Sequence, residues 1–425
     1  MKTPTIRILA AAFALGAAFA APCSGASPTV NPRLLARWVQ MAPGGAAEAR
    51  AVVSGAVCPA LEIDGVPAPM RERAAPDSKF PVRICALTLP KAARRATLLG
   101  EALPLPRPAP AHIVVLGDTG CRIKNLTVQA CDDPAQWPFH QVATSAAREK
   151  PDLVIHVGDY LYREGPCPPA QAQACGGTPW GDNWATWDAD FFAPAAPLLA
   201  AAPIVVVRGN HEECARSGAG WLRLLGPLPF SPHVPCTDHV APYAVPLGTV
   251  TLAVMDDAHA SDLDAPGDLV ALYRADFASI AKLAPAPVFL VMHRPVWGVV
   301  KFAFGMVLGG NRTLMAAQDQ GGIPPNVTLM LAGHIHTFEA INYEKGAPPQ
   351  ILAGEGGDLL DSAPSNLAGQ SVGTLKIASG LSLPGYGFLS FRRAANDAWS
   401  IDVLSAAGAP ERTCAFARRH LDCGK

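Results

Sequence analysis

Five segments of the chain place a potential metal ligand directly after a run of aliphatic residues: 113–120, 153–162, 204–212, 288–293 and 328–336. The residue types found there are Asp, Asn, Tyr and His, which offer the oxygen and nitrogen atoms that cations bind in proteins. A continuous aliphatic run is typical of a strand buried on both faces, and ligands of open α/β sheets lie beyond the carboxyl ends of such strands. We therefore expect these five loops to form one metal centre.

A pair of cations is what the hydrolysis of a phosphate ester needs, because the ester and hydroxide are both negatively charged. Two cations about 3.5–4 Å apart clamp the phosphate oxygens and generate hydroxide from bound water at mild pH. One carboxylate has to be shared by the two cations. Asp159 is the expected shared ligand, since the other ligand-bearing loops flank its strand in the sequence. The chemistry predicted from these residues is in-line attack of a metal-bound hydroxide on phosphorus.

The order of the motifs resembles that of the calcineurin-like metallophosphoesterases, most closely the purple acid phosphatases. The motifs are Gly-Asp-x-Gly (117–120), Gly-Asp-x-x-Tyr (158–162), Gly-Asn-His-Glu (209–212), a single His (293) and Gly-His-x-His (333–336), which together cover about 110–340. Many members of the wider superfamily have Asp-x-His in the first motif, whereas this chain has Asp118-Thr119-Gly120. In the purple acid phosphatases a tyrosine after the second aspartate replaces that histidine, and Tyr162 stands at this position.

The resemblance implies seven ligands for two metal ions. The first ion would take Asp118, Asp159, Tyr162 and His336, and the second Asp159, Asn210, His293 and His334. A tyrosinate favours a trivalent ion, so Fe(III) is expected in the first site. The second set suits a divalent ion, Fe, Zn or Mn, and the sequence does not choose among them.

Three residues near these ligands are predicted to contact the substrate: His211, Glu212 and Arg294. In the family the histidine at the position of His211 contacts the phosphate, and a cationic histidine can protonate a leaving group. His211 and Asp159 are therefore the expected catalytic residues. Glu212 could orient His211 or only stabilise its loop. Arg294 could touch the substrate or form a structural ion pair.

A small phosphomonoester is the expected substrate, because the motifs are nearest to those of acid phosphatases. A phosphodiesterase or nucleotide pyrophosphohydrolase on the same site is the alternative, and an exported binding protein without turnover is a third interpretation. The net charge is −1 and only 16% of residues are charged. No basic stripe occurs, which argues against a nucleic-acid scaffold. The sequence does not indicate the oligomeric state.

Residues 1–26 are predicted to be a cleaved secretory signal. Lys2 and Arg7 precede an apolar stretch over 8–21, and small residues allow cleavage after Ala20 or Ala26. That stretch is short for a membrane span, so we expect no transmembrane helix in the mature chain, although a short anchor is an alternative. The predicted location is the periplasm or the exterior of the cell.

The cysteines agree with export. There are eleven, and Cys23 lies at the signal boundary. The other ten fall into near neighbours, which indicates disulfides in an oxidising compartment, although sequence alone does not settle their connectivity. A cysteine-ligated metal is the competing interpretation, and the absence of a Cys-x-x-Cys pair disfavours it. The expected pairs are Cys58–Cys85, Cys121–Cys131, Cys167–Cys175, Cys214–Cys236 and Cys414–Cys423.

The fold class expected is α/β. The resemblance implies an α/β/β/α sandwich of two mixed sheets over 109–425, and the short apolar runs of 27–108 predict a small β-rich domain that ends in a Pro-rich linker. Asn31 and Pro32 predict a short helix over 32–41. Further helices are expected at 144–150 and 269–283, and a buried strand at 250–255. Strands at 340–343, 350–353, 387–391 and 399–404 are expected in a second sheet. The apolar loop 296–310 is interpreted as a lid or buried insertion, with a membrane-touching patch as the alternative.

Overall fold

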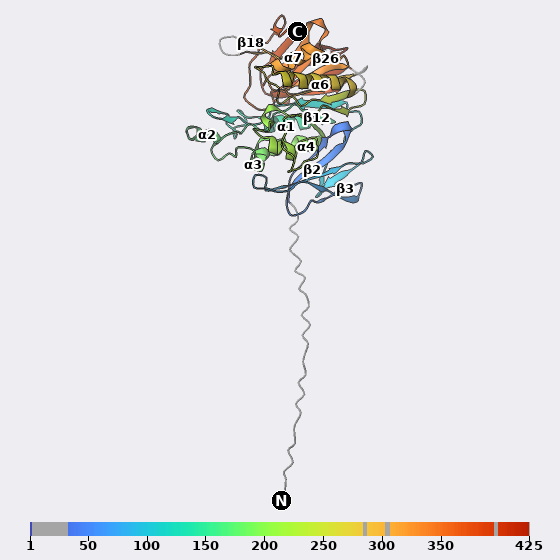
Figure 1. Ribbon diagram of the computed structural model, residues 1–425, viewed down its shortest axis with the longest axis vertical. Helices are drawn as coiled ribbons and strands as arrows, with labels where there is room; N and C mark the ends of the chain where they lie inside the picture. The colour runs from blue at the N-terminus through green and yellow to red at the C-terminus, as the bar shows by residue number, and fades with distance from the viewer. Residues whose placement is uncertain (2–32, 284–286, 302–306, 395–397, 425) are drawn as a thin grey trace. The chain divides into compact units, whose positions relative to one another are not determined.

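The computed structural model describes residue 1 and residues 33–283, 287–301, 307–394 and 398–424 (Figure 1). The predicted signal sequence lies outside these ranges, apart from its first residue. Within them, no helix combines the length and the apolar character needed to cross a membrane.

Two large mixed sheets form the centre of the described chain. The larger has eleven strands, and three of its central neighbours, β9, β12 and β13, run parallel. In spatial order its strands are β27 (His420–Asp422), β26 (Pro410–Ala417), β25 (Trp399–Ser405), β24 (Gly387–Arg393), β9 (His112–Leu116), β12 (Leu153–His156), β13 (Ile204–Val206), β1 (Arg33–Met41), β2 (Ala47–Ser54), β6 (Arg83–Thr88) and β5 (Arg71–Ala74).

The second sheet has eight strands, of which β15, β16, β19 and β21 run parallel. Its order is β14 (Tyr243–Pro246), β15 (Thr251–Val254), β16 (Val288–Val291), β19 (Val327–Ala332), β21 (Gln350–Ala353), β20 (Phe338–Tyr343), β23 (Leu375–Leu383) and β22 (Ser371–Val372). A four-stranded sheet contains β4 (Val66–Pro69), β3 (Ala60–Ile63), β7 (Ala96–Leu98) and β8 (Glu101–Ala102), and two small hairpins pair β10 (Ile123–Lys124) with β11 (Thr127–Val128) and β17 (Val300–Lys301) with β18 (Val307–Leu308).

The aliphatic runs of the central strands are explained by burial on both faces. Ile113 and Val115 of β9 belong to a core shared with strands of the second sheet, whereas Val114 and Leu116 belong to a core on the opposite face. Successive side chains of a strand point to opposite faces, so each of these faces needs an apolar residue at every second position.

Helices cover the outer face of each large sheet. On the larger sheet lie α1 (Phe139–Arg148), α3 (Trp184–Trp187), α4 (Ala193–Ala201) and α5 (Gly218–Leu224), and on the second lie α6 (Gly267–Leu283) and α7 (Arg312–Gly321) (Figure 1). The short helix α2 (Ala172–Cys175) lies in the loop after β12. The α/β/β/α sandwich is thus confirmed, as are the helices predicted at 144–150 and 269–283, although α1 begins earlier, at Phe139.

The helix predicted over 32–41 was wrong, because Arg33–Met41 forms β1. Gln40 pairs with Ile204 in the parallel direction, and the strand pairs with β2 along its other edge. Trp38 belongs to the core between the larger sheet and its covering helices, and Val39 belongs to the core between the two sheets. Pairing with two neighbours and burial on both faces therefore outweigh the local N-cap signal.

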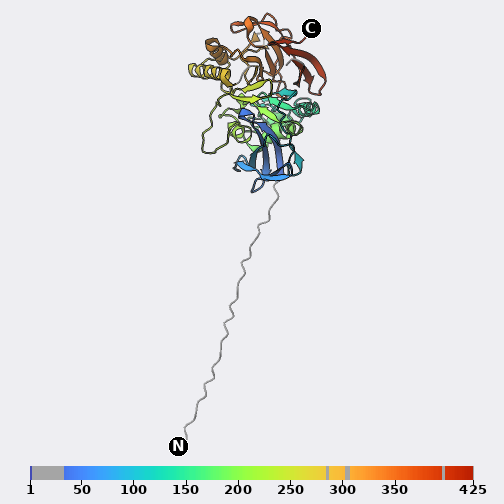
Figure 2. The same ribbon diagram turned by 90° about the vertical axis from the view of Figure 1, so that its right-hand side faces the viewer.

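The prediction of one second sheet for all late strands was wrong in part. β20 and β21 do lie in the second sheet, but β24 and β25 join the larger one, where Leu389 pairs with Val115. Strands from the N-terminal region also enter the larger sheet, and Figure 2 shows them in blue beside the green middle part of the chain. The proposed division at 108/109 stays a prediction.

The five predicted disulfides are confirmed. Each pair is bonded in the structure, with Cα–Cα distances from 3.8 Å for Cys414–Cys423 to 5.7 Å for Cys58–Cys85. The other three are Cys121–Cys131, Cys167–Cys175 and Cys214–Cys236. Near neighbours in sequence pair here because each bond closes a short local loop.

Candidate metal centre

The seven predicted ligands lie at the carboxyl ends of parallel strands from both large sheets. Asp118 follows β9, Asp159 and Tyr162 follow β12, and Asn210 follows β13. His293 follows β16, while His334 and His336 follow β19. The two facing sheets therefore place their ligand-bearing loops at a common edge.

The backbone at this edge adopts conformations that are uncommon for side-chain-bearing residues. Asp118, Asp159 and His334 have φ values of 56°, 59° and 71°. The left-handed region costs energy for such residues, and residues held there concentrate at functional sites. A side chain at Gly209 would come within 2.0 Å of Asp159 Oδ1, and one at Gly333 within 2.3 Å of Asp118 Oδ2. The glycines of these motifs thus provide space for the two carboxylates.

The ligands predicted for the first cation converge on the Tyr162 hydroxyl. Its oxygen lies 3.1 Å from Asp118 Oδ1, 2.8 Å from Asp159 Oδ2 and 3.0 Å from His336 Nε2. His336 Nε2 in turn lies 3.4 Å from Asp118 Oδ1. All four side chains are buried. They form a compact group of three oxygen-bearing residues and one imidazole.

The ligands predicted for the second cation lie on the other side of Asp159. His293 Nε2 is 3.0 Å from Asn210 Oδ1 and 3.2 Å from Asp159 Oδ2. Asp159, His293 and His334 each have a ligand atom within 4.8 Å of the others. Asp159 contacts members of both groups, as expected of a shared ligand.

Backbone and carboxylate groups orient the three imidazoles. Nδ1 of His293 lies 2.9 Å from the Val157 carbonyl oxygen, and Nδ1 of His336 lies 2.7 Å from that of Leu359, so Nε2 of each ring faces the ligand cluster. His334 uses Nε2 to contact Asp262 Oδ2 at 2.9 Å, which leaves Nδ1 for a cation. Such outer contacts set the tautomer and direction of metal-binding histidines.

The electrostatics of the cluster favour positive charge. Burial alone would lower the pKa of His293, but Asp159, its hydrogen bond and further carboxylates raise it to about 9. Burial likewise opposes the effect of Asp358 and Asp118 on His336, whose pKa they raise to about 10. Burial and the two aspartates raise the pKa of Tyr162 well above its usual value. The carboxylates thus draw cations to this position, and the donor set of oxygen and nitrogen atoms fits two metal ions.

The sequence prediction missed Glu164, which contacts His211. Glu164 Oε1 lies 2.7 Å from His211 Nδ1, and the same carboxylate pairs with Arg216 and, at 2.9 Å, with Lys124. Burial and Arg216 lower the pKa of His211 to about 4, although Asp159 and Glu164 act in the opposite direction. The position of Glu164 two residues after Tyr162 was the available signal, but the local sequence does not show that its side chain reaches His211.

Neither Glu212 nor Arg294 lines the cavity of about 500 Å³ that opens beside the ligand cluster. The Glu212 carboxylate is fully buried and accepts hydrogen bonds from the backbone amides of Gly209, Tyr160 and Leu161 at 3.0–3.2 Å. Arg294 pairs with Asp262 and donates to the Ala258 carbonyl oxygen. These contacts favour the structural alternative for both residues, and their contact with substrate stays a prediction.

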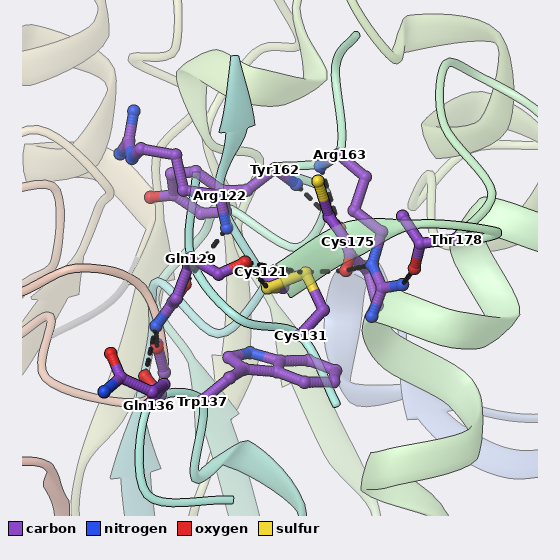
Figure 3. The surroundings of a disulfide bond; sticks show 12 residues. Cys121, Arg122, Gln129, Cys131, Gln136, Trp137, Tyr162, Arg163, Cys175 and Thr178 are labelled. Atoms are coloured by element: carbon purple, nitrogen blue, oxygen red, sulfur yellow. Dashed lines mark hydrogen bonds and ion pairs between the residues drawn. A yellow bond between two sulfur atoms is a disulfide. The ribbon is translucent and has the colours of Figure 1, made fainter. Parts of the chain in front are cut away.

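The open side of the cluster is a polar cavity of about 500 Å³ that Arg122, Lys124, Arg216 and His211 help to line. The Arg122 guanidinium lies 4.8 Å from the centre of the Tyr162 ring and pairs with Asp358. Figure 3 shows Arg122 beside the Cys121–Cys131 disulfide and close to Tyr162. The disulfide closes the loop that carries Arg122 and therefore helps to hold this cation at the cavity.

Comparison with known families agrees with this geometry. The model of the calcineurin-like phosphoesterases matches residues 111–338, more than half of the chain and the part that holds all seven predicted ligands. The chain belongs to the calcineurin-like phosphoesterase family. Membership makes it a hydrolase, and the metallophosphoesterases of this family use a binuclear metal site.

Solved structures with the same fold include two proteins of low sequence identity. Purple acid phosphatase PPD1 from seeds of yellow lupin (Lupinus luteus) is 14% identical, with a TM-score of 0.53, and the match covers 90% of this chain and 74% of that one. PhoD is 12% identical, with a TM-score of 0.52 and 92% of each chain covered. The search of curated proteins found no match. This calcineurin-like phosphoesterase therefore shares the fold of both proteins.

Proposed function

We propose that the protein is an exported binuclear phosphatase that hydrolyses phosphomonoesters. The observation that carries the proposal is the meeting of seven potential ligands from two sheets around Asp159. Asp118, Asp159, Tyr162 and His336 would hold one ion, and Asp159, Asn210, His293 and His334 the other. Bound there, the ions supply the positive charge and water activation that phosphate-ester hydrolysis needs.

The chain's own residues would bind the phosphate and assist the leaving group. Lys124 and Arg216 line the cavity, where they offer positive charge to a phosphate in addition to that of the ions. His211 is held between the Tyr162 ring, at a centroid distance of 3.8 Å, and Glu164. With Nδ1 donating to the Glu164 carboxylate, Nε2 carries a proton only in the cationic ring, which acidic pH favours because burial lowers the pKa of His211 to about 4; in that form Nε2 would donate the proton to the departing alcohol oxygen.

The identity of the ions is a separate part of the proposal. The Tyr162 phenol lies against two carboxylates in a buried site, where its deprotonation requires a strongly charged cation. We therefore propose Fe(III) beside Tyr162 and a divalent Fe, Zn or Mn beside Asn210. Iron bound to tyrosinate absorbs visible light, and the Tyr162→Phe variant should lose that absorption. A colourless, active protein that contains only zinc or manganese would contradict the iron assignment alone.

Rates on two model esters test the reaction class. We expect p-nitrophenyl phosphate to be hydrolysed with a higher kcat/KM than bis-p-nitrophenyl phosphate, after elemental analysis has confirmed two ions per chain. A strong preference for the diester would replace the phosphatase with the phosphodiesterase alternative on the same site.

Export is supported by the five disulfides, which are typical of oxidising compartments. The proposed signal at 1–26 can be checked by N-terminal sequencing of the protein recovered outside the cytoplasm. Recovery of an uncleaved chain from the cytoplasm would contradict this part.

A further inference from the structure

A large apolar cavity adjoins the polar cavity of the metal centre. Its volume is about 710 Å³, which lies in the range of pockets that hold small molecules. His334 and Asp361 line both cavities. A molecule whose phosphate lies at the ligand cluster can therefore extend past these two residues into the apolar cavity.

We propose that this cavity receives the alcohol part of the substrate, so that the enzyme prefers phosphomonoesters of apolar alcohols. The inference rests on the proposed phosphatase function and names the substrate class of the same site.

The wall of the cavity is formed mainly by apolar side chains from several elements, with Arg312, Asp319 and Ser371 among its polar members. Pro295 and Val300 come from the segment after β16, Met315 and Ala316 from α7, Ile335 from the loop after β19, and Val372 from β22. At the rim, Leu263 is 74% exposed. An exposed leucine at the entrance of an apolar cavity beside a charged site provides additional apolar surface for a ligand.

The polar groups at the inner end are already engaged within the protein. Asp262 contacts Arg294 and His334, and it accepts a hydrogen bond of 2.8 Å from Asn311 Nδ2. Asn311 Oδ1 accepts from the Leu314 amide at the start of α7. A sugar or other polyhydroxyl group would have to compete with these contacts, whereas an alkyl or aryl group needs none.

The consequence is a dependence of KM on the length of the alcohol. Burial of one methylene is worth about 0.8 kcal/mol, which corresponds to about fourfold in affinity. In a series of n-alkyl phosphates from ethyl to decyl phosphate, we expect KM to fall by up to about fourfold for each added methylene until the chain fills the cavity. The kcat should change much less, because the reacting atoms are the same.

A variant that fills the cavity tests where the alkyl group lies. Ala316→Trp should lower the ratio of kcat/KM for octyl phosphate to that for ethyl phosphate by about tenfold or more. The matched control is Ala278→Trp, which places the same side chain on an exposed position of α6 and should leave the ratio unchanged. If Ala316→Trp fails to fold by its melting curve, Met315→Glu, which places a carboxylate in the cavity, should lower the same ratio.

Binding of non-hydrolysable ligands separates the two proposals. Calorimetric titration of the metal-loaded enzyme with octylphosphonate and ethylphosphonate should show tighter binding of the longer ligand. The apolar-substrate inference would be overturned if all alkyl phosphates were hydrolysed with the same KM and the variants kept the ratio of kcat/KM for octyl phosphate to that for ethyl phosphate. The proposed phosphatase function would still hold in that case. Tighter binding of octylphosphonate without hydrolysis of any ester would contradict the phosphatase and support the cavity as the apolar binding site.

Discussion

The two large sheets contribute different atoms to the metal centre. The loops of the larger sheet supply the carboxylates of Asp118 and Asp159, the phenol of Tyr162 and the amide of Asn210, all of which would bind a metal ion through oxygen. The loops of the second sheet supply only imidazoles, from His293, His334 and His336. The anionic candidate ligands therefore come from one sheet and the imidazoles from the other, while Asp358 and Asp361 after β21 add negative charge from the second sheet.

The two halves also differ in how their side chains are held. On the oxygen side, a left-handed backbone at Asp118 and Asp159 directs the carboxylates, and Gly209 lies against one of them. On the nitrogen side, carbonyl oxygens of Val157 and Leu359 orient the rings of His293 and His336. The oxygen half should thus determine whether cations bind, and the nitrogen half how they are positioned.

The largest effect is expected from the shared carboxylate of the oxygen half. Asp159→Asn should lower kcat/KM for p-nitrophenyl phosphate by about a thousandfold or more, because the loss of several kcal/mol of charge stabilisation corresponds to that factor. The kcat/KM measured by steady-state kinetics and the metal content measured by elemental analysis should both decrease in this variant. The exposed Asp268→Asn on α6 is the control and should keep both. Unchanged activity in Asp159→Asn would contradict the catalytic proposal.

Metal removal tests whether the ions join the two halves. Since each proposed ion would take ligands from both sheets, dialysis against a chelator should lower Tm by several degrees, with about 4 kcal/mol lost if the metal had been present at 1,000 times its Kd. Adding back iron with zinc or manganese should restore it. The Asp159→Asn variant should show a much smaller response to chelator, and an equal response would mean that the stabilising metal lies elsewhere.

A smaller effect is expected from Glu164, and Glu212 provides the contrast. Glu164→Gln should lower kcat about tenfold with little change in KM, because His211 loses a charged partner that positions it. The effect should vanish in a His211→Ala background, which a purely structural role would not produce.

Glu212→Gln should instead lower stability by roughly 1–3 kcal/mol, measured by urea unfolding, because a buried acceptor of backbone hydrogen bonds is disturbed. The reverse pattern would assign the orienting role to Glu212.

The smallest effect concerns an ion pair away from the ligands. His239 Nε2 lies 2.8 Å from Asp276 Oδ2 on α6, and this hydrogen bond raises the pKa of His239 against the opposing effect of burial. The pKa of His239 is higher in the folded than in the unfolded protein, so the pair stabilises the fold fully at pH values below the pKa of an unfolded histidine, about 6.5. This stabilisation is lost as the pH rises through the pKa of His239 in the folded protein. Asp276→Asn should lower Tm at pH 5 by an amount equivalent to less than about 1 kcal/mol, and less at pH 8. A larger loss at pH 8, or a change in kcat, would contradict this assignment.

The meeting of the seven candidate ligands was predictable because the chemistry restricts their types and each follows a buried strand. Two-metal hydrolysis needs a shared carboxylate, and Asp159 directly follows a buried strand in the Gly-Asp-x-x-Tyr motif. The near-neighbour disulfides were predictable for a similar reason, since each closes a short loop. The helix predicted over 32–41 was wrong because β1 pairs with the adjacent strand β2 and with β13, which lies far away in the sequence.

By itself, the sequence determined which candidate metal ligands follow the buried strands and in what order, because those residue types and glycines are needed locally. Only the tertiary structure decided that Glu164, rather than Glu212, contacts His211, and that an apolar cavity adjoins the ligands at His334. Both outcomes depend on where distant segments meet when two sheets face each other, and side-chain type alone does not encode that placement.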